Sequence, residues 1–292
     1  MKTHHKINTL ILAVAVLVMR LSSIVLADNI YVSSYEANAI YKFDSSGNKT
    51  TFASGLHGPT GLAFDSSGYL YTTNFRNGTV EKFDSSGHGT IFASGFNGPT
   101  GLVFDSSGYL YVADYASNGM IAKLDLSGNR STFALGLEFP FGLAFDSSGY
   151  LYVANQTGGT IEKFDMSGNG TIFTSRLNNP MGLAFDSSGY LYAASWYSGT
   201  IEKFDSSGNR TAFASRFNNP VGLAFDSSGN LYATNWTDGM IGKFDSSGNM
   251  SLFASGLVHP AFITTQIPEP ATLLLLGLGA AVITKKQKSK SI

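Results

Sequence analysis

Short apolar runs and polar turns alternate along most of the chain, and the same pattern returns at a fixed spacing. Aligning the repeats on their proline gives steps of 40, 41, 40, 40 and 40 residues, with the prolines at Pro59, Pro99, Pro140, Pro180, Pro220 and Pro260. Within residues 180–216, the runs GLAFD, LYAAS, TIEKFD and TAFAS are separated by segments rich in Asp, Ser and Gly. Short runs of this composition predict four antiparallel β-strands. A fixed period of this length is typical of a solenoid, a propeller or an array.

The string DSSG, which recurs in every repeat, has the chemistry of a tight turn. Its aspartate can accept hydrogen bonds from backbone N–H groups two residues on, and its glycine adopts the positive φ that a sharp reversal needs. The aspartates Asp44, Asp65, Asp84 and Asp105 also invite comparison with a calcium loop. Such a loop needs several oxygen ligands around one ion, whereas each turn supplies one carboxylate. We therefore interpret DSSG as a connection between strands.

The two ends of the repeat region complement each other. Residues 29–54 contain the last three strands of a unit and lack the first, and residues 260–265 supply a first strand with nothing after it. With the five complete units, these fragments make six blades. We therefore predict an all-β, six-bladed β-propeller of four-stranded antiparallel blades, its ring closed by the C-terminal strand joining the N-terminal three. A linear solenoid would have no use for this split, whereas a ring leaves only short, protected edges.

The unit resembles the NHL-type repeat of six-bladed propellers. The resemblance rests on the order proline, glycine, Asp-x-x-Gly, Leu-Tyr-Val-Ala-Asn, a loop with glycine, Ile-x-Lys-Phe and a second Asp-x-x-Gly, and it covers residues 29–266. The YVAN ending of one strand is also similar to the YVTN surface propellers, and the superfamily includes gluconolactonase-like proteins. The resemblance implies the fold, but a propeller by itself does not indicate a function.

The N-terminus has the layout of a secretory signal. A basic start is followed by an apolar run over residues 7–19 and by small residues up to Ala27, which predicts a signal peptide over residues 1–27. An uncleaved membrane anchor is the alternative. Either interpretation predicts that residues 28–266 are exported.

The C-terminus, residues 267–292, combines three features in order. Pro268-Glu269-Pro270 precedes an apolar run over residues 271–284 and a lysine cluster. This order resembles the PEP-CTERM sorting signal, although the family's tail is usually rich in arginine. The resemblance implies processing by an exosortase-type membrane enzyme and delivery to the bacterial cell surface or extracellular matrix. Before processing, the segment would form a short transmembrane helix with its basic tail in the cytoplasm. A plain C-terminal anchor is the alternative.

Composition narrows the classes of partner. Residues 28–266 hold 12 of the 19 Lys and Arg and 19 of the 20 Asp and Glu, which leaves a net charge of −7. This charge is of the wrong sign for gripping a phosphate backbone, so we expect no nucleic-acid partner. The chain has no cysteine, which excludes disulfides, thiolate nucleophiles and cysteine-ligated zinc.

The propeller face opposite the DSSG turns gathers two rings of side chains. The first ring closes each second strand and consists of Ser34, Asn74, Asp114, Asn155, Ser195 and Asn235. The second ring, one residue later, consists of Tyr35, Phe75, Tyr115, Gln156, Trp196 and Trp236. Flat aromatic faces beside hydrogen-bonding groups suit a sugar or another amphipathic ligand. Alternatively, the rings pack between blades and the asparagines cap the following turns.

Two enzymatic interpretations follow from resemblance. Gluconolactonase-like propellers hold a divalent ion, such as Ca, Zn or Mn, with Glu, Asn and Asp around the channel, which implies Glu138, Asp114, Asn155 and Asn235 as ligands of a lactonase or esterase. Phe139 replaces the glycine expected after Glu138. The chain also resembles propeller lyases that open cyclic peptide antibiotics and use histidine with glutamate. His57 and His259 face the appropriate side, but no glutamate accompanies them in register.

The likeness of the blades to one another favours a scaffold over an enzyme, because an active site needs one asymmetric set of groups. We expect an exported, surface- or matrix-sorted propeller that acts as a binding or structural module without a cofactor. Extracellular polysaccharide or a protein partner is the expected ligand. The aromatic residues of the second ring, with Asn74, Asp114, Asn155 and Asn235, are the expected binding residues.

Overall fold

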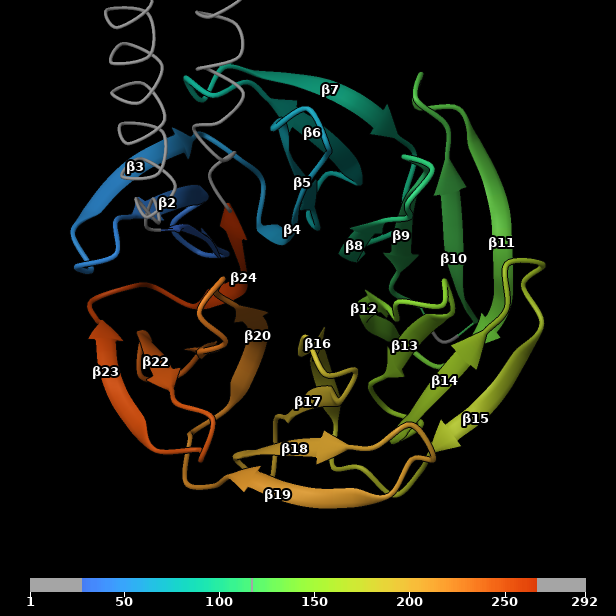
Figure 1. Ribbon diagram of the computed structural model, residues 1–292. Coiled ribbons are helices and arrows are strands. Elements are labelled where there is room, and N and C mark those ends of the chain that lie inside the picture. Colours follow the sequence, from blue (N-terminus) through green and yellow to red (C-terminus); the bar gives the residue numbers. More distant parts are fainter. Residues whose placement is uncertain (1–27, 117, 267–292) are drawn as a thin grey trace, which may run out of the picture. The chain divides into compact units, whose positions relative to one another are not determined.

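A computed structural model describes residues 28–116 and 118–266, and these form a six-bladed β-propeller. Its 24 strands make six four-stranded antiparallel sheets, arranged as blades around a central axis (Figure 1). The predicted fold class is therefore confirmed. The predicted signal peptide (1–27) and sorting segment (267–292) lie outside the described residues. None of the residues in the two described ranges forms an apolar helix long enough to span a membrane.

Each blade runs from an inner first strand to an outer fourth strand. The first strands are β4 (Pro59–Phe64), β8 (Pro99–Phe104), β12 (Pro140–Phe145), β16 (Pro180–Phe185), β20 (Pro220–Phe225) and β24 (Pro260–Gln266). The second strands are β1 (Asn29–Ser34), β5 (Leu70–Asn74), β9 (Leu110–Asp114), β13 (Leu151–Asn155), β17 (Leu191–Ser195) and β21 (Leu231–Asn235). The third strands are β2 (Ala39–Phe43), β6 (Thr79–Phe83), β10 (Gly119–Leu124), β14 (Thr160–Phe164), β18 (Thr200–Phe204) and β22 (Met240–Phe244). The fourth strands are β3 (Lys49–Ser54), β7 (Gly89–Ser94), β11 (Arg130–Leu137), β15 (Gly170–Thr174), β19 (Arg210–Ala214) and β23 (Met250–Ala254).

The ring closes by pairing the two ends of the repeat region. Strand β24 lies beside β1 in the sheet order β24-β1-β2-β3, with Ile30 opposite Thr265 and Val32 opposite Ile263. Strands far apart in sequence thus complete one blade, as the complementary fragments predict. Closure pairs the edges that an open ring would leave exposed.

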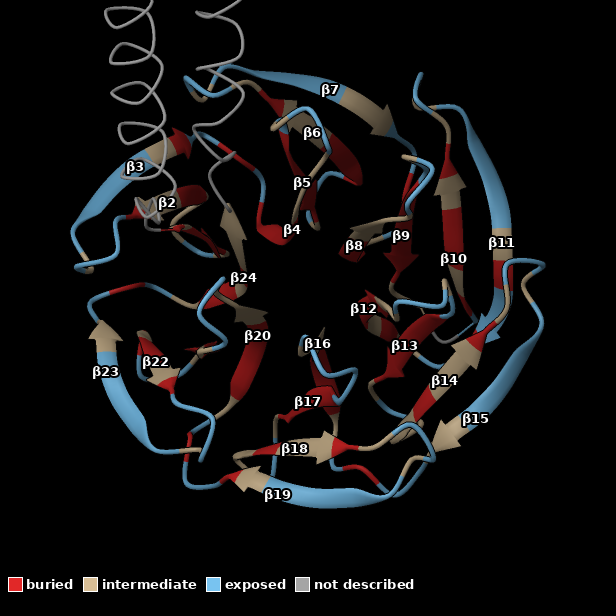
Figure 2. Ribbon diagram, viewed as in Figure 1, coloured by how far each residue is buried: buried red, intermediate tan, exposed pale blue. Residues whose placement is uncertain are grey.

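Burial is greatest in the second strands and least in the outer fourth strands. The second strands are buried along their whole length in five of the six blades, whereas most residues of the fourth strands are exposed (Figure 2). The core between blades is built around a tyrosine of each second strand. Tyr111, for example, lies edge to face with Phe133 of its own blade and Phe145 of the next, with ring centroids 5.0 and 5.1 Å apart. This arrangement is favourable for aromatic pairs and ties neighbouring blades together.

The DSSG turns have the predicted geometry. In the first of them that follows an inner strand, Asp65 Oδ1 accepts hydrogen bonds from the backbone N–H groups of Ser67 and Tyr69, both at 2.9 Å. Gly68 has a φ of +82°, in the left-handed region that favours glycine. The aspartate is therefore hydrogen-bonded within its own turn. Each of these turns follows a first or a third strand, and these strands run in the same direction, so all the turns lie on one face of the propeller.

Candidate ligand-binding funnel

Five aromatic residues of the predicted second ring line a single cavity. Its volume is about 240 Å³, and it lies on the face opposite the DSSG turns that follow the inner strands. The lining residues are Tyr35, Phe75, Tyr115, Trp196 and Trp236 at the rim, with Thr60, Phe141, Met181 and Ala261 deeper toward the axis. We call this cavity the funnel. The structure thus brings together side chains from five different blades, as the alignment of the repeats predicts.

A repeated backbone contact positions the rim. In every blade, the N–H of the rim residue donates to the carbonyl of the residue that precedes the proline; Phe75 donates to Gly58 and Trp196 to Asn179, both at 3.0 Å. All six residues before the prolines have a left-handed φ, and they are Gly58, Gly98, Phe139, Asn179, Asn219 and His259. This conformation is uncommon for residues other than glycine. The left-handed backbone directs the carbonyl of each pre-proline residue toward the N–H of the rim residue. The resulting hydrogen bond holds the rim residue beside the axis.

The rim residues also contact one another in sequence around the axis. Ring centroids are 6.0 Å apart for Tyr35 and Phe75, 5.9 Å for Phe75 and Tyr115, and 5.8 Å for Trp196 and Trp236. Tyr35 and Trp236 are 5.5 Å apart. The series is interrupted at Gln156, whose Oε1 accepts a hydrogen bond from the Tyr115 hydroxyl. These contacts between neighbouring rings hold the rim residues in place around the cavity.

Two phenylalanines close the floor. Phe262 occupies the position that is glycine in the other five first strands. A Cβ on Gly61 would lie 2.4 Å from the Thr100 carbonyl oxygen, so glycine allows neighbouring inner strands to approach closely. Phe262 instead stacks on Phe141, with centroids 5.3 Å apart and ring planes 20° apart. Phe141 lines the funnel, whereas Phe262 lines a second apolar cavity on the opposite side, formed with residues such as Leu102 and Leu223.

The first predicted ring lies behind the rim. Its six members are all buried, none lines the funnel, and most of their polar atoms are bonded within their own blade. Asn74 accepts the His57 N–H at 3.2 Å and donates to Glu81 at 3.0 Å. Asp114 accepts the Asn97 N–H at 2.8 Å, and burial raises the pKa of its carboxyl. These contacts hold the loops that carry the funnel.

Two further members of this ring, Asn235 and Ser34, are also hydrogen-bonded to nearby protein groups. Asn235 donates to Asp238 at 2.9 Å and accepts the N–H of that residue, and Ser34 donates to the Val258 carbonyl. Ser195 Oγ and Asn155 Oδ1, however, are buried without a hydrogen-bond partner among residues 28–116 and 118–266.

No hydrogen bond or ion pair of the described residues joins the four predicted metal ligands to one another. Glu138 is exposed beside Gly158, near Asn155, whereas Asp114 and Asn235 remain in their own hydrogen bonds. Asn155 Nδ2 donates to Glu162 at 2.6 Å. Burial, assisted by the charge of Glu138, raises the pKa of the Glu162 carboxyl. Within the described parts of the chain, no group of three or more His, Asp or Glu residues could hold a metal ion.

Of the histidines in the described parts, His259 lies at the rim. Its imidazole stacks on Trp236, with centroids 4.7 Å apart and planes 6° apart. Its Nδ1 is buried without a hydrogen-bond partner in residues 28–116 and 118–266, and its φ is +47°. His57 and His88 are exposed, and His88 lies in a turn, 2.8 Å from Ser86 Oγ.

Sequence reasoning did not identify the deeper part of the funnel. Phe141 and Met181 follow the repeated proline, at a position that holds Thr, Val or Ala in the other blades. The change from glycine to Phe262 is visible in the aligned repeats. This change is the signal in the sequence that could have indicated the closed floor.

Comparison with known proteins places the chain among propellers. A model of the virginiamycin B lyase family matches residues 23–256, and a PEP-CTERM protein-sorting motif matches residues 266–286. That motif indicates export and cell-surface sorting, and implies processing by an exosortase. No curated relative matches the chain in sequence.

Solved structures share the fold. A chain of a nidogen/laminin complex is similar with a TM-score of 0.75 and 21% identity, over 82% of this chain and 98% of that one. A catalytically inactive histidine-to-alanine variant of virginiamycin B lyase from Staphylococcus aureus, with quinupristin, has a TM-score of 0.62 and 17% identity, over 78% and 84%. A gluconolactonase from Xanthomonas campestris has a TM-score of 0.63 and 18% identity, over 72% and 83%.

Proposed function

The chain belongs to the virginiamycin B lyase family, and from that premise we propose that it is a cell-surface propeller that binds an amphipathic ligand in the funnel. The observation that carries the proposal is the convergence of five aromatic rings from five blades around one cavity with a closed floor. Aromatic side chains dominate binding energy where they line a preformed pocket.

The chemistry of the funnel limits the ligand. Most amide and carboxylate groups of the buried first ring are hydrogen-bonded within the blades, so they leave few polar groups for a ligand. A suitable ligand therefore presents a flat apolar face to the rings and keeps its polar groups toward solvent. The C–H face of a sugar or an aromatic side chain meets this description. We propose extracellular polysaccharide or a protein partner as the ligand, and a binding or structural role in the surface layer or matrix.

The test is retention of the full-length protein on arrays of purified bacterial polysaccharides. Trp196→Ala and Trp236→Ala should each weaken binding roughly 30-fold, the loss typical of a central aromatic contact. Tyr190→Ala is the matched control, because Tyr190 is a partly exposed aromatic residue in a DSSG turn, on the other face. Equal retention of all three variants would contradict a ligand site in the funnel.

A lyase activity is the second candidate, and the position of His259 favours it. This imidazole stacks on a funnel residue, and histidine is the commonest general base. Incubation with quinupristin, followed by mass spectrometry, should show the ring-opened product if the protein is a lyase, and His259→Ala should abolish it. Absence of product with the unmodified protein would remove this candidate and leave the binding role.

A cation-dependent lactonase or esterase is a further alternative. It draws support from Asn155, whose Oδ1 has no hydrogen-bond partner among the described residues. The Asn155 amide nitrogen donates to Glu162, and the side chain lies close to Glu138. Asp114 and Asn235, the other two predicted ligands, are hydrogen-bonded to Asn97 and Asp238, so the support for this alternative comes from Asn155 and Glu138. Elemental analysis after dialysis against calcium, zinc or manganese should find about one ion per chain, lost in Glu138→Gln. No retained ion would exclude this alternative.

A further inference from the structure

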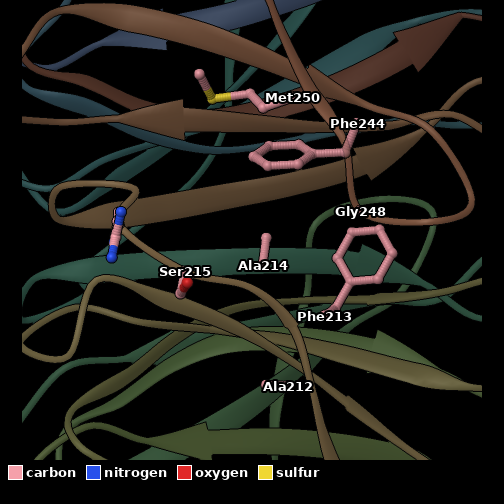
Figure 3. A pocket seen from close by; sticks show the side chains of 8 residues that line it. Ala212, Phe213, Ala214, Ser215, Phe244, Gly248 and Met250 are labelled. Carbon is pink, nitrogen blue, oxygen red and sulfur yellow. The ribbon is translucent and has the colours of Figure 1, made fainter.

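A third cavity opens at the outer edge of the propeller, between the blade of β16 to β19 and the blade of β20 to β23. Its volume is about 530 Å³, which lies within the range of small-molecule sites, about 300 to 1,000 Å³. It is lined by Ala212, Phe213, Ala214, Ser215 and Arg216 of one blade and by Phe244, Gly248 and Met250 of the next. Figure 3 shows Phe244 and Met250 on one side of the space and Phe213 and Ala214 on the other. We call this cavity the notch.

Two aligned positions in the blades that form the notch hold smaller residues than in the preceding pair of blades, and only the first of them, Ala212, lines the cavity. Ala212 occupies the position of Ile172 in the preceding blade, and Gly242 occupies the position of Glu202. The walls remain close at one end, where a Cβ on Gly248 would lie 2.3 Å from the Phe213 carbonyl oxygen. The space is therefore a local departure from the repeat between two blades that are otherwise in contact.

Arg216 brings an uncompensated positive charge to this apolar space. It forms no ion pair with any residue in the described ranges, and its φ of +63° is in the left-handed region. The aligned position is glycine in four blades and arginine in one other, Arg176. A side chain held in this uncommon conformation at a cavity can indicate a functional constraint.

The preceding junction provides an internal comparison. There, Arg210 donates to the Arg176 carbonyl and is ion-paired with Glu202 at 3.3 Å. At the notch, Met250 replaces Arg210 and Gly242 replaces Glu202. The notch therefore has no counterpart of Glu202. Its lining combines apolar side chains with the Arg216 guanidinium and contains no carboxylate.

We propose that the notch is a binding site for a small amphipathic carboxylate. The apolar part of the ligand would lie against Phe213, Phe244 and Met250. The carboxylate of the ligand would pair with the Arg216 guanidinium and accept a hydrogen bond from Ser215. Ion-paired hydrogen bonds of this kind add both affinity and direction. The site is independent of the funnel, which lies beside the axis.

The experiment is titration of the full-length protein with decanoate, with decan-1-ol as the uncharged probe. Decanoate should bind once per chain, and decan-1-ol about tenfold more weakly. Both tryptophans line the funnel, so binding in the notch should leave tryptophan emission unchanged. A change in emission on saturation would place the probe in the funnel and overturn the proposal.

Three variants make the test specific. Arg216→Gly should weaken decanoate binding about tenfold, consistent with the loss of one charged hydrogen bond, whereas Arg176→Gly should leave it unchanged. Both variants introduce the residue that the other four blades carry, so folding should be retained. Ala212→Ile should abolish binding by filling the notch with a residue tolerated at the same position in two other blades. Equal binding by Ala212→Ile and the unmodified protein, or equal loss in both arginine variants, would overturn the assignment.

Discussion

Phe262 of the closing strand stacks on Phe141 of the opposite blade, with ring centroids 5.3 Å apart and planes 20° apart. Strand β24 belongs to the blade that joins the two ends of the chain, and β12 begins the blade three positions away around the ring. The same pair therefore closes the funnel floor and links opposite sides of the propeller near its axis.

Phe262→Gly, which restores the residue of the other five blades, should open the floor and lower stability. Loss of a partly buried phenylalanine and its stacking partner should cost about 2 kcal/mol of unfolding free energy, less than for a fully buried ring. Urea denaturation followed by circular dichroism measures this difference. Phe262→Leu is the control, since it keeps an apolar side chain in the floor and should lose less. A glycine variant as stable as the unmodified protein would show that the stack contributes nothing.

Glu162→Gln should stabilise the protein near neutral pH and have little effect in acid. Burial, with the charge of Glu138, raises the pKa of the Glu162 carboxyl above 4.5. A raised folded-state pKa means that the favourable contribution of this group is present below pH 4.5 and is lost as the pH rises through the folded-state pKa. Glutamine avoids the buried charge and can still accept the Asn155 hydrogen bond.

The measurement is the midpoint of thermal unfolding at pH 4 and pH 7, with Glu202→Gln as the matched control. Glu202 occupies the same position in the next blade but is ion-paired with Arg210, so its replacement should bring no gain at pH 7. A stabilisation by Glu162→Gln that is the same at both pH values would contradict a titrating origin.

Arg176→Gly should increase stability by about 1 kcal/mol, because φ at this position is +63° and left-handed backbone costs roughly 1 to 2 kcal/mol for residues other than glycine. For a domain of this size, the melting temperature should rise by about 2 to 4 °C. Arg176→Ala removes the same side chain but retains the backbone cost. If the alanine variant gained as much as the glycine variant, the effect would come from the side chain.

Changing Pro268, Glu269 and Pro270 to alanine should leave an unprocessed precursor in the membrane fraction. These three residues lie within the matched sorting motif, which spans residues 266–286. Immunoblotting of membrane, surface and medium fractions shows the size and location of the protein. Gln287→Ala, just beyond the matched motif, is the control and should be processed normally. Normal processing of the triple variant would mean that these residues do not act as the signal.

The local features of this protein could be predicted from the sequence because their causes are local. An aspartate and a glycine three residues apart make a turn whatever the rest of the chain does. Asp65 and Gly68 illustrate this, because Asp65 Oδ1 accepts the Ser67 N–H and the Asp65 carbonyl accepts the Gly68 N–H. The 40-residue period and the complementary ends then determine the blade and its closure. The rim could be predicted too, since aligned residues of identical blades must fall on one ring.

The contacts made by residues that depart from the repeat could be learned only from the tertiary structure. The role of Asn74 depends on the His57 N–H, which reaches it from the loop before the blade, so the sequence alone left binding and capping both open. Phe262 is visible as a break in the pattern, but its partner Phe141 lies in the opposite blade and meets it only after the ring closes. The notch lies between two neighbouring blades, with Phe213 on one wall and Phe244 and Met250 on the other. Contacts of this kind join residues distant in sequence, and their geometry follows from the packing of blades rather than from any local propensity.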